Sequence, residues 1–181
     1  MVYYVDGLYG SDAADGLTRQ TAFATTARVN ALALSGGDEV RFRCGATYPG
    51  TLHPCRADGD GQILITHYGV GALPVIEADG EAAIDLVDIS GVTLRGLAAT
   101  APNGLFGIRV LNEAGGEMRH IHIKSCHVYD VYGGHERFSI CTGGIVATSG
   151  HGHPGWFSDL LIEDQEEFEA FLEENRAYWD Y

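Results

Sequence analysis

Arg119-His-Ile-His-Ile-Lys-Ser-Cys-His-Val-Tyr-Asp-Val131 is the stretch that decides the fold, because its pattern recurs on both sides of it. Ile121 and Ile123 alternate with His122 and Lys124. Successive side chains of a β-strand point to opposite faces, so the two isoleucines are expected to face a core and the two polar residues to face solvent.

The same register returns at long intervals along the chain. It falls earlier on Val92-Thr-Leu-Arg-Gly-Leu97, where Cys126 corresponds to Leu97, and later on Leu160-Leu-Ile-Glu163. Short self-similar strands at such long and unequal spacings indicate stacked coils rather than hairpins. The sequence therefore predicts an all-β fold of the β-solenoid type, with strands that pair in parallel.

Alternation of apolar and polar residues also identifies the expected core. The apolar positions of five strands should form one continuous interior. The predicted inward residues are Val40, Phe42, Ile63, Ile65, Val92, Leu94, Ile121, Ile123, Leu160 and Ile162.

Composition narrows the class of protein. The chain has 181 residues, of which 45% are hydrophobic and 25 are glycine, as is typical of one ordered domain with many turns. A formal charge of −14 argues against nucleic acid as a partner, and against a polyanionic glycan unless the few basic residues cluster. No apolar run approaches the roughly 18 residues of a membrane span. No signal peptide is recognisable at the start, so localisation is left unassigned.

The two ends of the chain are expected to be helical. Thr25 is a plausible N-cap for a helix over 25–34, which would cap the N-terminal end of the solenoid. Residues 163–181 carry eight acidic side chains and one arginine, and apolar residues of this tail fall on one helical face. We therefore expect a solenoid over 1–164 and an acidic amphipathic helix over 165–181.

Four cysteines are too few and too scattered for a disulfide scaffold or a zinc knuckle. Cys126 sits at an inward position and is expected to pack as a small apolar residue. Cys44 and Cys55 are the one pair considered for a disulfide bridge.

Several motifs resemble bacterial right-handed parallel β-helix proteins of the pectate-lyase-like superfamily. They include Tyr3-Tyr-Val-Asp6, Gly37-Asp-Glu-Val40, Gly45-Ala-Thr-Tyr48 and His120-Ile-His-Ile-Lys-Ser-Cys-His-Val128. The resemblance runs from about residue 3 to residue 164. It implies a right-handed parallel β-helix and a polysaccharide or oligosaccharide partner, and relatives of this kind are often secreted. The chain is shorter than these relatives, so it resembles a short or truncated member.

The resemblance gives the first candidate site. Lyases of this superfamily often use a lysine or arginine as the base that removes a proton next to a uronate carboxylate. Lys124 with Arg95 fits that role, because a neighbouring like charge lowers the pKa of a lysine. The alternative is an exposed charge ladder in which Glu163 pairs with Lys124 and keeps its pKa high.

Two longer connections, 132–142 and 149–157, give the second candidate. They could meet above one groove, with a carboxylate pair drawn from Asp130, Glu136 and Asp159 for glycoside hydrolysis. The alternative is surface decoration without catalysis. The candidate substrate-binding residues are His122, Tyr132, His135, Arg137, His151, His153 and Trp156, and the candidate catalytic residues are Lys124, Arg95 and Asp130.

No cofactor is predicted, and no metal site is assigned. Calcium is possible near Asp6, Asp12 and Asp15, although the spacing is not that of an EF-hand and turns stabilised by the aspartates are the simpler use. Two functions remain open. The chain is a carbohydrate-active protein related to polysaccharide lyases and glycoside hydrolases, or it is a noncatalytic glycan-binding or structural module, including a shortened remnant of a longer enzyme.

Overall fold

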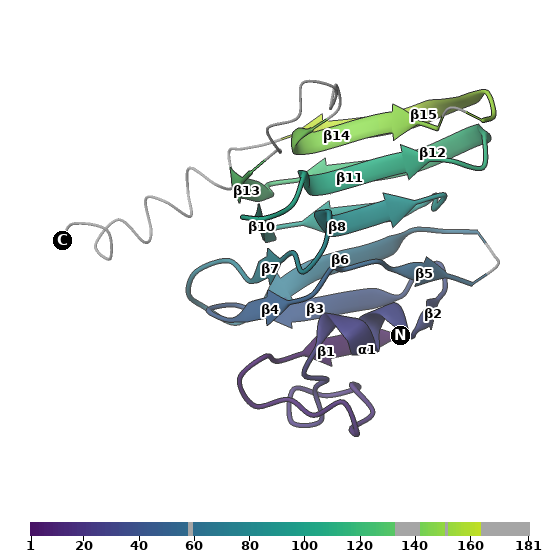
Figure 1. The fold of residues 1–181 in the computed structure, drawn as a ribbon. Helices are drawn as coiled ribbons and strands as arrows, with labels where there is room; N and C mark the ends of the chain where they lie inside the picture. The colour runs from purple at the N-terminus through teal and green to yellow at the C-terminus, as the bar shows by residue number, and fades with distance from the viewer. Residues whose placement is uncertain (58–59, 133–141, 151, 164–181) are drawn as a thin grey trace.

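The protein is built from parallel strands that stack in layered sheets (Figure 1). The computed structural model describes residues 1–57, 60–132, 142–150 and 152–163. The largest sheet has six strands, in the spatial order β1 (Val2–Val5), β3 (Glu39–Arg43), β6 (Ile63–Tyr68), β9 (Val92–Arg95), β12 (Gly116–Lys124) and β15 (Gly155–Glu163).

Two further sheets lie beside it, and a small one flanks them. The four-stranded sheet contains β4 (Thr47–Pro49), β7 (Val75–Glu77), β10 (Ala98–Ala101) and β13 (His127–Val131). The three-stranded sheet contains β8 (Ala82–Val87), β11 (Phe106–Asn112) and β14 (Gly143–Ser149), and the two-stranded sheet contains β2 (Ala33–Leu34) and β5 (Cys55–Arg56).

The order in which the chain visits these sheets repeats. From β6 onward each turn passes through the six-stranded, the four-stranded and then the three-stranded sheet, before β15 returns to the first. All pairings between the strands that the structure describes are parallel. This all-β arrangement is consistent with a β-solenoid.

The register agrees with the repeat in the sequence. Ile121 of β12 lies opposite Val92 of β9 on one side and opposite Leu160 of β15 on the other. These are the partners expected from the apolar pattern. A stack of coils requires β9 and β12 to pair in parallel, and they do.

Most predicted core residues are buried. Val40, Phe42, Ile63, Ile65, Val92, Leu94, Ile121 and Ile123 are all at most 1% exposed. Leu160 is only half-buried, and Ile162 is 49% exposed, although both lie in register with buried partners on β12. Both belong to β15, the last strand of its sheet, and among the described residues this strand has a neighbouring strand on one side only.

The helix expected over 25–34 is only partly present. Helix α1 spans Thr26–Asn30, and Thr25 is its N-cap, with its hydroxyl accepting a hydrogen bond from the Arg28 amide at 3.2 Å. The next residues leave the helix, because Leu34 is fully buried and β2 pairs with β5 instead. A helix of this length does not support the predicted N-terminal capping helix, and the predicted tail helix over 165–181 lies outside the described residues.

The suggested bridge between Cys44 and Cys55 is wrong. Both are free thiols, Cys44 buried just after β3 and Cys55 exposed in β5, and these strands belong to different sheets. Burial raises the pKa of the Cys44 thiol. Cys126 packs against the core as the pattern indicated.

Candidate functional site

The outward face of β12 and β15 carries the polar rows expected from the register. Lys124 lies opposite Arg95 of β9 and Glu163 of β15, and His122 lies opposite Thr93 and Leu161. The Lys124 ammonium is 2.7 Å from a Glu163 carboxylate oxygen. The structure therefore contains the lysine and glutamate ion pair of the charge-ladder alternative.

A carboxylate on the same face is in contact with two imidazoles. His120 Nδ1 lies 2.6 Å from Asp159 Oδ2. His122 Nε2 lies 3.0 Å from the same oxygen, but the two groups are not aligned as a hydrogen bond. These contacts, His120 foremost, hold the pKa of Asp159 below its usual value. Asp159 is therefore a carboxylate that stays ionised at neutral pH and holds the His120 ring by a hydrogen bond.

His120 and Asp159 also share an unusual backbone conformation. Their φ angles are 55° and 56°, in the left-handed region, and Gly91, at the equivalent position before β9, has a φ of 70°. Side chains with a Cβ disfavour this region by about 1 kcal/mol or more. The conformation recurs along the chain and is not confined to the pocket, since φ is 48°, 48° and 47° at Asp88, Ser125 and Asp130.

The cause of this conformation can be read in the burial pattern. Met118 and Ile121 are both buried, although strict alternation would place them on opposite faces of the strand. His120 is the residue at which the strand changes face, as in a β-bulge. Asp159 lies at the matching place in β15, so the two bulged residues are neighbours.

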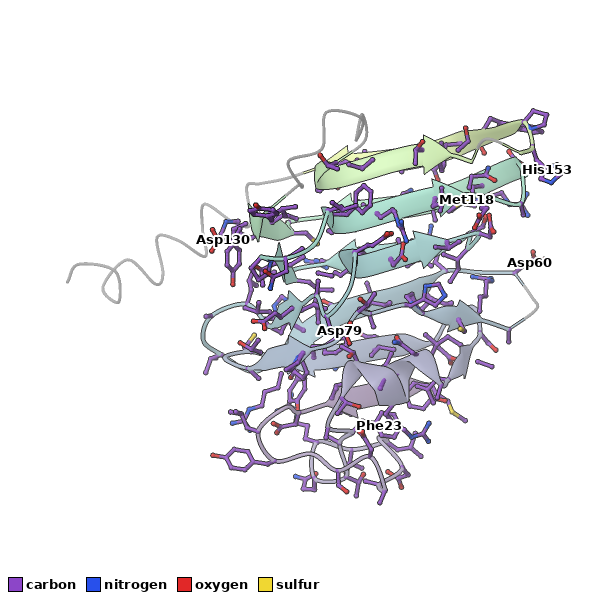
Figure 2. The ribbon with its side chains drawn as sticks, in the orientation of Figure 1. Phe23, Asp60, Asp79, Met118, Asp130 and His153 are labelled. Carbon is purple, nitrogen blue, oxygen red and sulfur yellow. The ribbon has the colours of Figure 1, made fainter. Side chains whose placement is uncertain are left out.

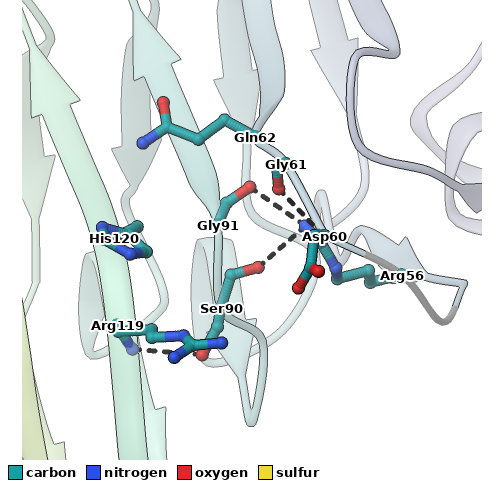
Figure 3. Close-up of a pocket in the computed structure, with 8 residues that line it drawn as sticks. All are labelled: Arg56, Asp60, Gly61, Gln62, Ser90, Gly91, Arg119 and His120. Atoms are coloured by element: carbon teal, nitrogen blue, oxygen red, sulfur yellow. Dashed lines mark hydrogen bonds between the residues drawn. The ribbon is translucent and has the colours of Figure 1, made fainter.

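A pocket of about 430 Å³ opens beside His120 (Figure 3). It lies where the chain enters β6 and β9 and where β12 changes face. Its polar lining includes Arg56, Asp60, Gln62, Ser90, Arg119 and His120.

Arg56 is fixed in one wall of this pocket. Its guanidinium donates to the carbonyl oxygens of Ser90, Gly91 and Gly61 at 3.1, 3.3 and 2.8 Å. Gly91 is required next to it, because a Cβ at that position would lie 2.8 Å from Arg56 Nη1. The close approach of backbone and guanidinium therefore depends on a residue without a side chain.

Arg119 occupies the opposite wall. Its amide donates to the Ser90 hydroxyl at 3.1 Å, which ties β12 to the turn before β9. No hydrogen bond or ion pair engages its guanidinium within the part of the chain that the structure describes. Arg119 thus presents a charged, planar donor group to the pocket.

Trp156 lies further along the same face. It is 57% exposed on β15, opposite Glu117 of β12. The next outward residue, Ser158, donates from its hydroxyl to a Glu117 carboxylate oxygen at 2.6 Å. An exposed indole, two carboxylates and the pocket thus share one surface of β12 and β15.

Three other candidate residues lie outside β12 and β15, the two strands whose surface carries Trp156 and borders the pocket. Asp130 is an exposed residue of β13, in the four-stranded sheet, and His153 precedes β15 on the opposite side of the stack (Figure 2). Tyr132 follows β13 and is 58% exposed. The candidates His135, Glu136, Arg137 and His151 lie outside the described residues.

The aspartates considered for calcium serve the local backbone. Asp6 accepts hydrogen bonds from the Leu8 and Tyr9 amides, Asp12 from the Ala24 and Thr25 amides, and Asp15 from the Leu17 amide. Among the described residues, no group of three or more histidine, cysteine, aspartate or glutamate side chains is placed to hold a metal ion. No helix in this part of the chain is long and apolar enough to cross a membrane.

Sequence reasoning missed Arg119, His120 and the pocket beside them. The available signal was the odd spacing of Met118 and Ile121, which marks a change of face at His120. Arg56 and Ser90 could not be found this way, because they enter the pocket from turns whose course depends on the neighbouring coils.

No protein-family model matches this chain, and no curated protein matches it. Among solved structures, the selenomethionine form of a GH136 lacto-N-biosidase from Eubacterium ramulus matches 90% of the chain with a TM-score of 0.73 and 22% identity. Its native form matches 90% with a TM-score of 0.65 and 23% identity. The chain covers 33% and 30% of these two structures, about a third of their length. At this identity the likeness concerns the fold.

Proposed function

We propose that this chain is the parallel β-helix part of a carbohydrate-active protein, and that it holds a glycan along the outward face of β9, β12 and β15. The proposal includes a right-handed coil and membership of the pectate-lyase-like superfamily. It is supported by the resemblance in the sequence and by the likeness in fold to a lacto-N-biosidase.

One observation carries the proposal. Trp156 exposes 57% of its surface on the strand that also supplies Asp159, and Asp159 contacts His120, which lines the pocket. Tryptophan combines a large apolar ring with an N–H donor, and exposed rings of this kind are enriched at binding surfaces. Sugars present apolar faces to such rings and hydroxyl groups to the polar side chains around them.

The test is calorimetric titration with a panel of oligosaccharides that includes one ending in lacto-N-biose. Trp156→Ala should weaken binding at least tenfold, about 1.4 kcal/mol. Tyr132→Ala is the matched control, since Tyr132 is 58% exposed but follows β13 in another sheet. If Trp156→Ala binds as tightly as wild type and Tyr132→Ala loses binding, the glycan binds near Tyr132 and not on the face of β15.

Hydrolysis is a second candidate, favoured by the carboxylates on this face. Glu117 lies opposite Trp156, which precedes Asp159 by three residues, a span of roughly 10 Å along a strand. Glycoside hydrolases place two carboxyl groups about 5 to 10 Å apart. Loss of new reducing ends in both Glu117→Gln and Asp159→Asn, with glycan binding retained, would support hydrolysis. If the wild-type protein binds the glycan but releases no reducing ends, it is a noncatalytic glycan-binding module.

The lyase hypothesis for Lys124 and Arg95 stays a proposal. Lys124→Ala should abolish the new ultraviolet absorbance of the unsaturated ends that a lyase produces from uronate polymers. Unchanged activity in this variant would remove Lys124 from the site and leave its ion pair with Glu163 as a structural feature.

A further inference from the structure

The pocket beside His120 concentrates positive charge in an acidic chain. The formal charge of the whole sequence is −14, yet two arginines line this one pocket against a single carboxylate, that of Asp60. Arginine retains its charge at any physiological pH. The average composition of the surface therefore does not explain why positively charged side chains gather at this pocket.

Arg119 is the group best placed to meet a ligand. Its backbone is held by the Ser90 hydroxyl, and its guanidinium is not engaged by any of the described residues. Because the guanidinium is planar and offers paired N–H donors, it matches the geometry of a carboxylate or sulfate group.

His120 supplies the second contact. Its Nδ1 faces the Asp159 carboxylate, so the remaining ring nitrogen, Nε2, is the one that a ligand can meet. Nε2 donates to an anion when the ring carries a proton on both nitrogens. Ser90 and Gln62 add neutral polar groups to the same lining. Figure 3 shows Arg119 and His120 projecting from β12 on one side of the pocket, with Arg56 and Asp60 on the other.

We infer that this pocket is a subsite for one anionic sugar unit, whose carboxylate or sulfate group is held by Arg119 and His120. The inference rests on the proposed glycan binding and specifies which unit occupies the pocket. A volume of about 430 Å³ falls within the range of pockets that enclose small ligands.

The rest of the molecule limits the ligand to an isolated anionic group. Outside the pocket the outward face carries three carboxylates, Glu117, Asp159 and Glu163, and two cations, Arg95 and Lys124, of which Lys124 is paired with Glu163. The chain is strongly negative overall. A polymer charged at every unit would place several anions against these carboxylates. A largely neutral glycan with one charged unit would not.

The experiment is calorimetry with three oligosaccharides of one length: neutral, ending in glucuronic acid, and carrying one sulfate ester. At least one charged ligand should bind ten times more tightly than the neutral parent, and comparison of the two charged ligands identifies which anion the pocket takes. Arg119→Gln should abolish that preference. Arg19→Gln, which removes the same charge from a second pocket near the N-terminal strand, should preserve it.

Arg119→Lys provides a second variant that keeps the charge but not the paired donors, and it should retain only part of the preference. Urea denaturation establishes that each variant is folded. Equal affinity for charged and neutral ligands, or a preference that survives Arg119→Gln, overturns the subsite while glycan binding stands. If none of the three ligands binds and the wider panel also fails, the proposed function itself is wrong.

Discussion

His120 combines an unfavourable backbone conformation with a side chain placed at the edge of a pocket. Its φ of 55° belongs to a region that favours glycine, and its ring contacts Asp159, which has the same conformation on the next strand. The ring is 51% exposed, so burial contributes little to holding it there. The contact with Asp159, rather than burial, is what holds the imidazole in place.

Two substitutions separate these contributions. His120→Gly and His120→Ala remove the same imidazole, but glycine tolerates a positive φ. The glycine variant should therefore be more stable than the alanine variant by about 1 kcal/mol. The measurement is the urea midpoint of each variant. Both variants should bind the preferred charged oligosaccharide more weakly than wild type does. Equal midpoints for glycine and alanine would show that the backbone at this position is not strained.

At the scale of the elements, the turn before β9 depends on the absence of a side chain. Gly91→Ala places a Cβ 2.8 Å from both Arg56 Nη1 and the Gly61 carbonyl oxygen, in a backbone with a φ of 70°. Gly37 is a matched control, since its φ is 89° and a Cβ there meets nothing within 4 Å. Gly37→Ala should cost about 1 kcal/mol, and Gly91→Ala about 1 to 3 kcal/mol more. Similar unfolding free energies for the Gly37→Ala and Gly91→Ala variants would show that the turn before β9 can shift to accommodate a Cβ at little cost.

Neighbouring strands of the six-stranded sheet differ in how much one side chain stabilises them. Ile123 of β12 is 1% exposed, and its register partner Ile162 of β15 is 49% exposed. Ile123→Ala should destabilise the protein by about 2 to 5 kcal/mol, whereas Ile162→Ala should cost no more than about 1 kcal/mol. Denaturant unfolding measures both. A large loss in Ile162→Ala would show that β15 is covered in solution.

Much of this arrangement of elements follows from the sequence. Buried apolar residues of successive coils must stack, so the alignment of Val92, Ile121 and Leu160 could be read before any coordinates. The end of α1 could not, because Leu34 fits a helical period as well as an inward strand position. The pocket could not be predicted from the sequence either. Its walls come from separate coils, and the bulge at His120 orients a side chain that alternation alone assigns to no face.

At the scale of the whole molecule, charge sets the response to salt. With a net charge of −14, the protein should repel a long polyanion at low ionic strength. Salt screens that repulsion over about 10 Å at roughly 0.1 M, so binding of a polyuronate should strengthen as salt is added, whereas an oligosaccharide with one anion should bind more weakly. Calorimetry at several salt concentrations, with the neutral parent as reference, measures both trends. A polyuronate that binds best at low salt would contradict this.

The unequal lengths of chain on the two sides of β12 have an evolutionary consequence. The return from β12 to β15 is longer than that from β9 to β12, yet the pairing of Ile121 with Leu160 stays in step with that of Ile121 with Val92. The number of residues between paired strands of successive coils therefore does not change the register in which those strands pair. Insertions and deletions in such a scaffold can be selected for what they contact, without rearranging the interior. A protein engineer could exchange the segment between β13 and β14 while leaving the surface around His120 in place.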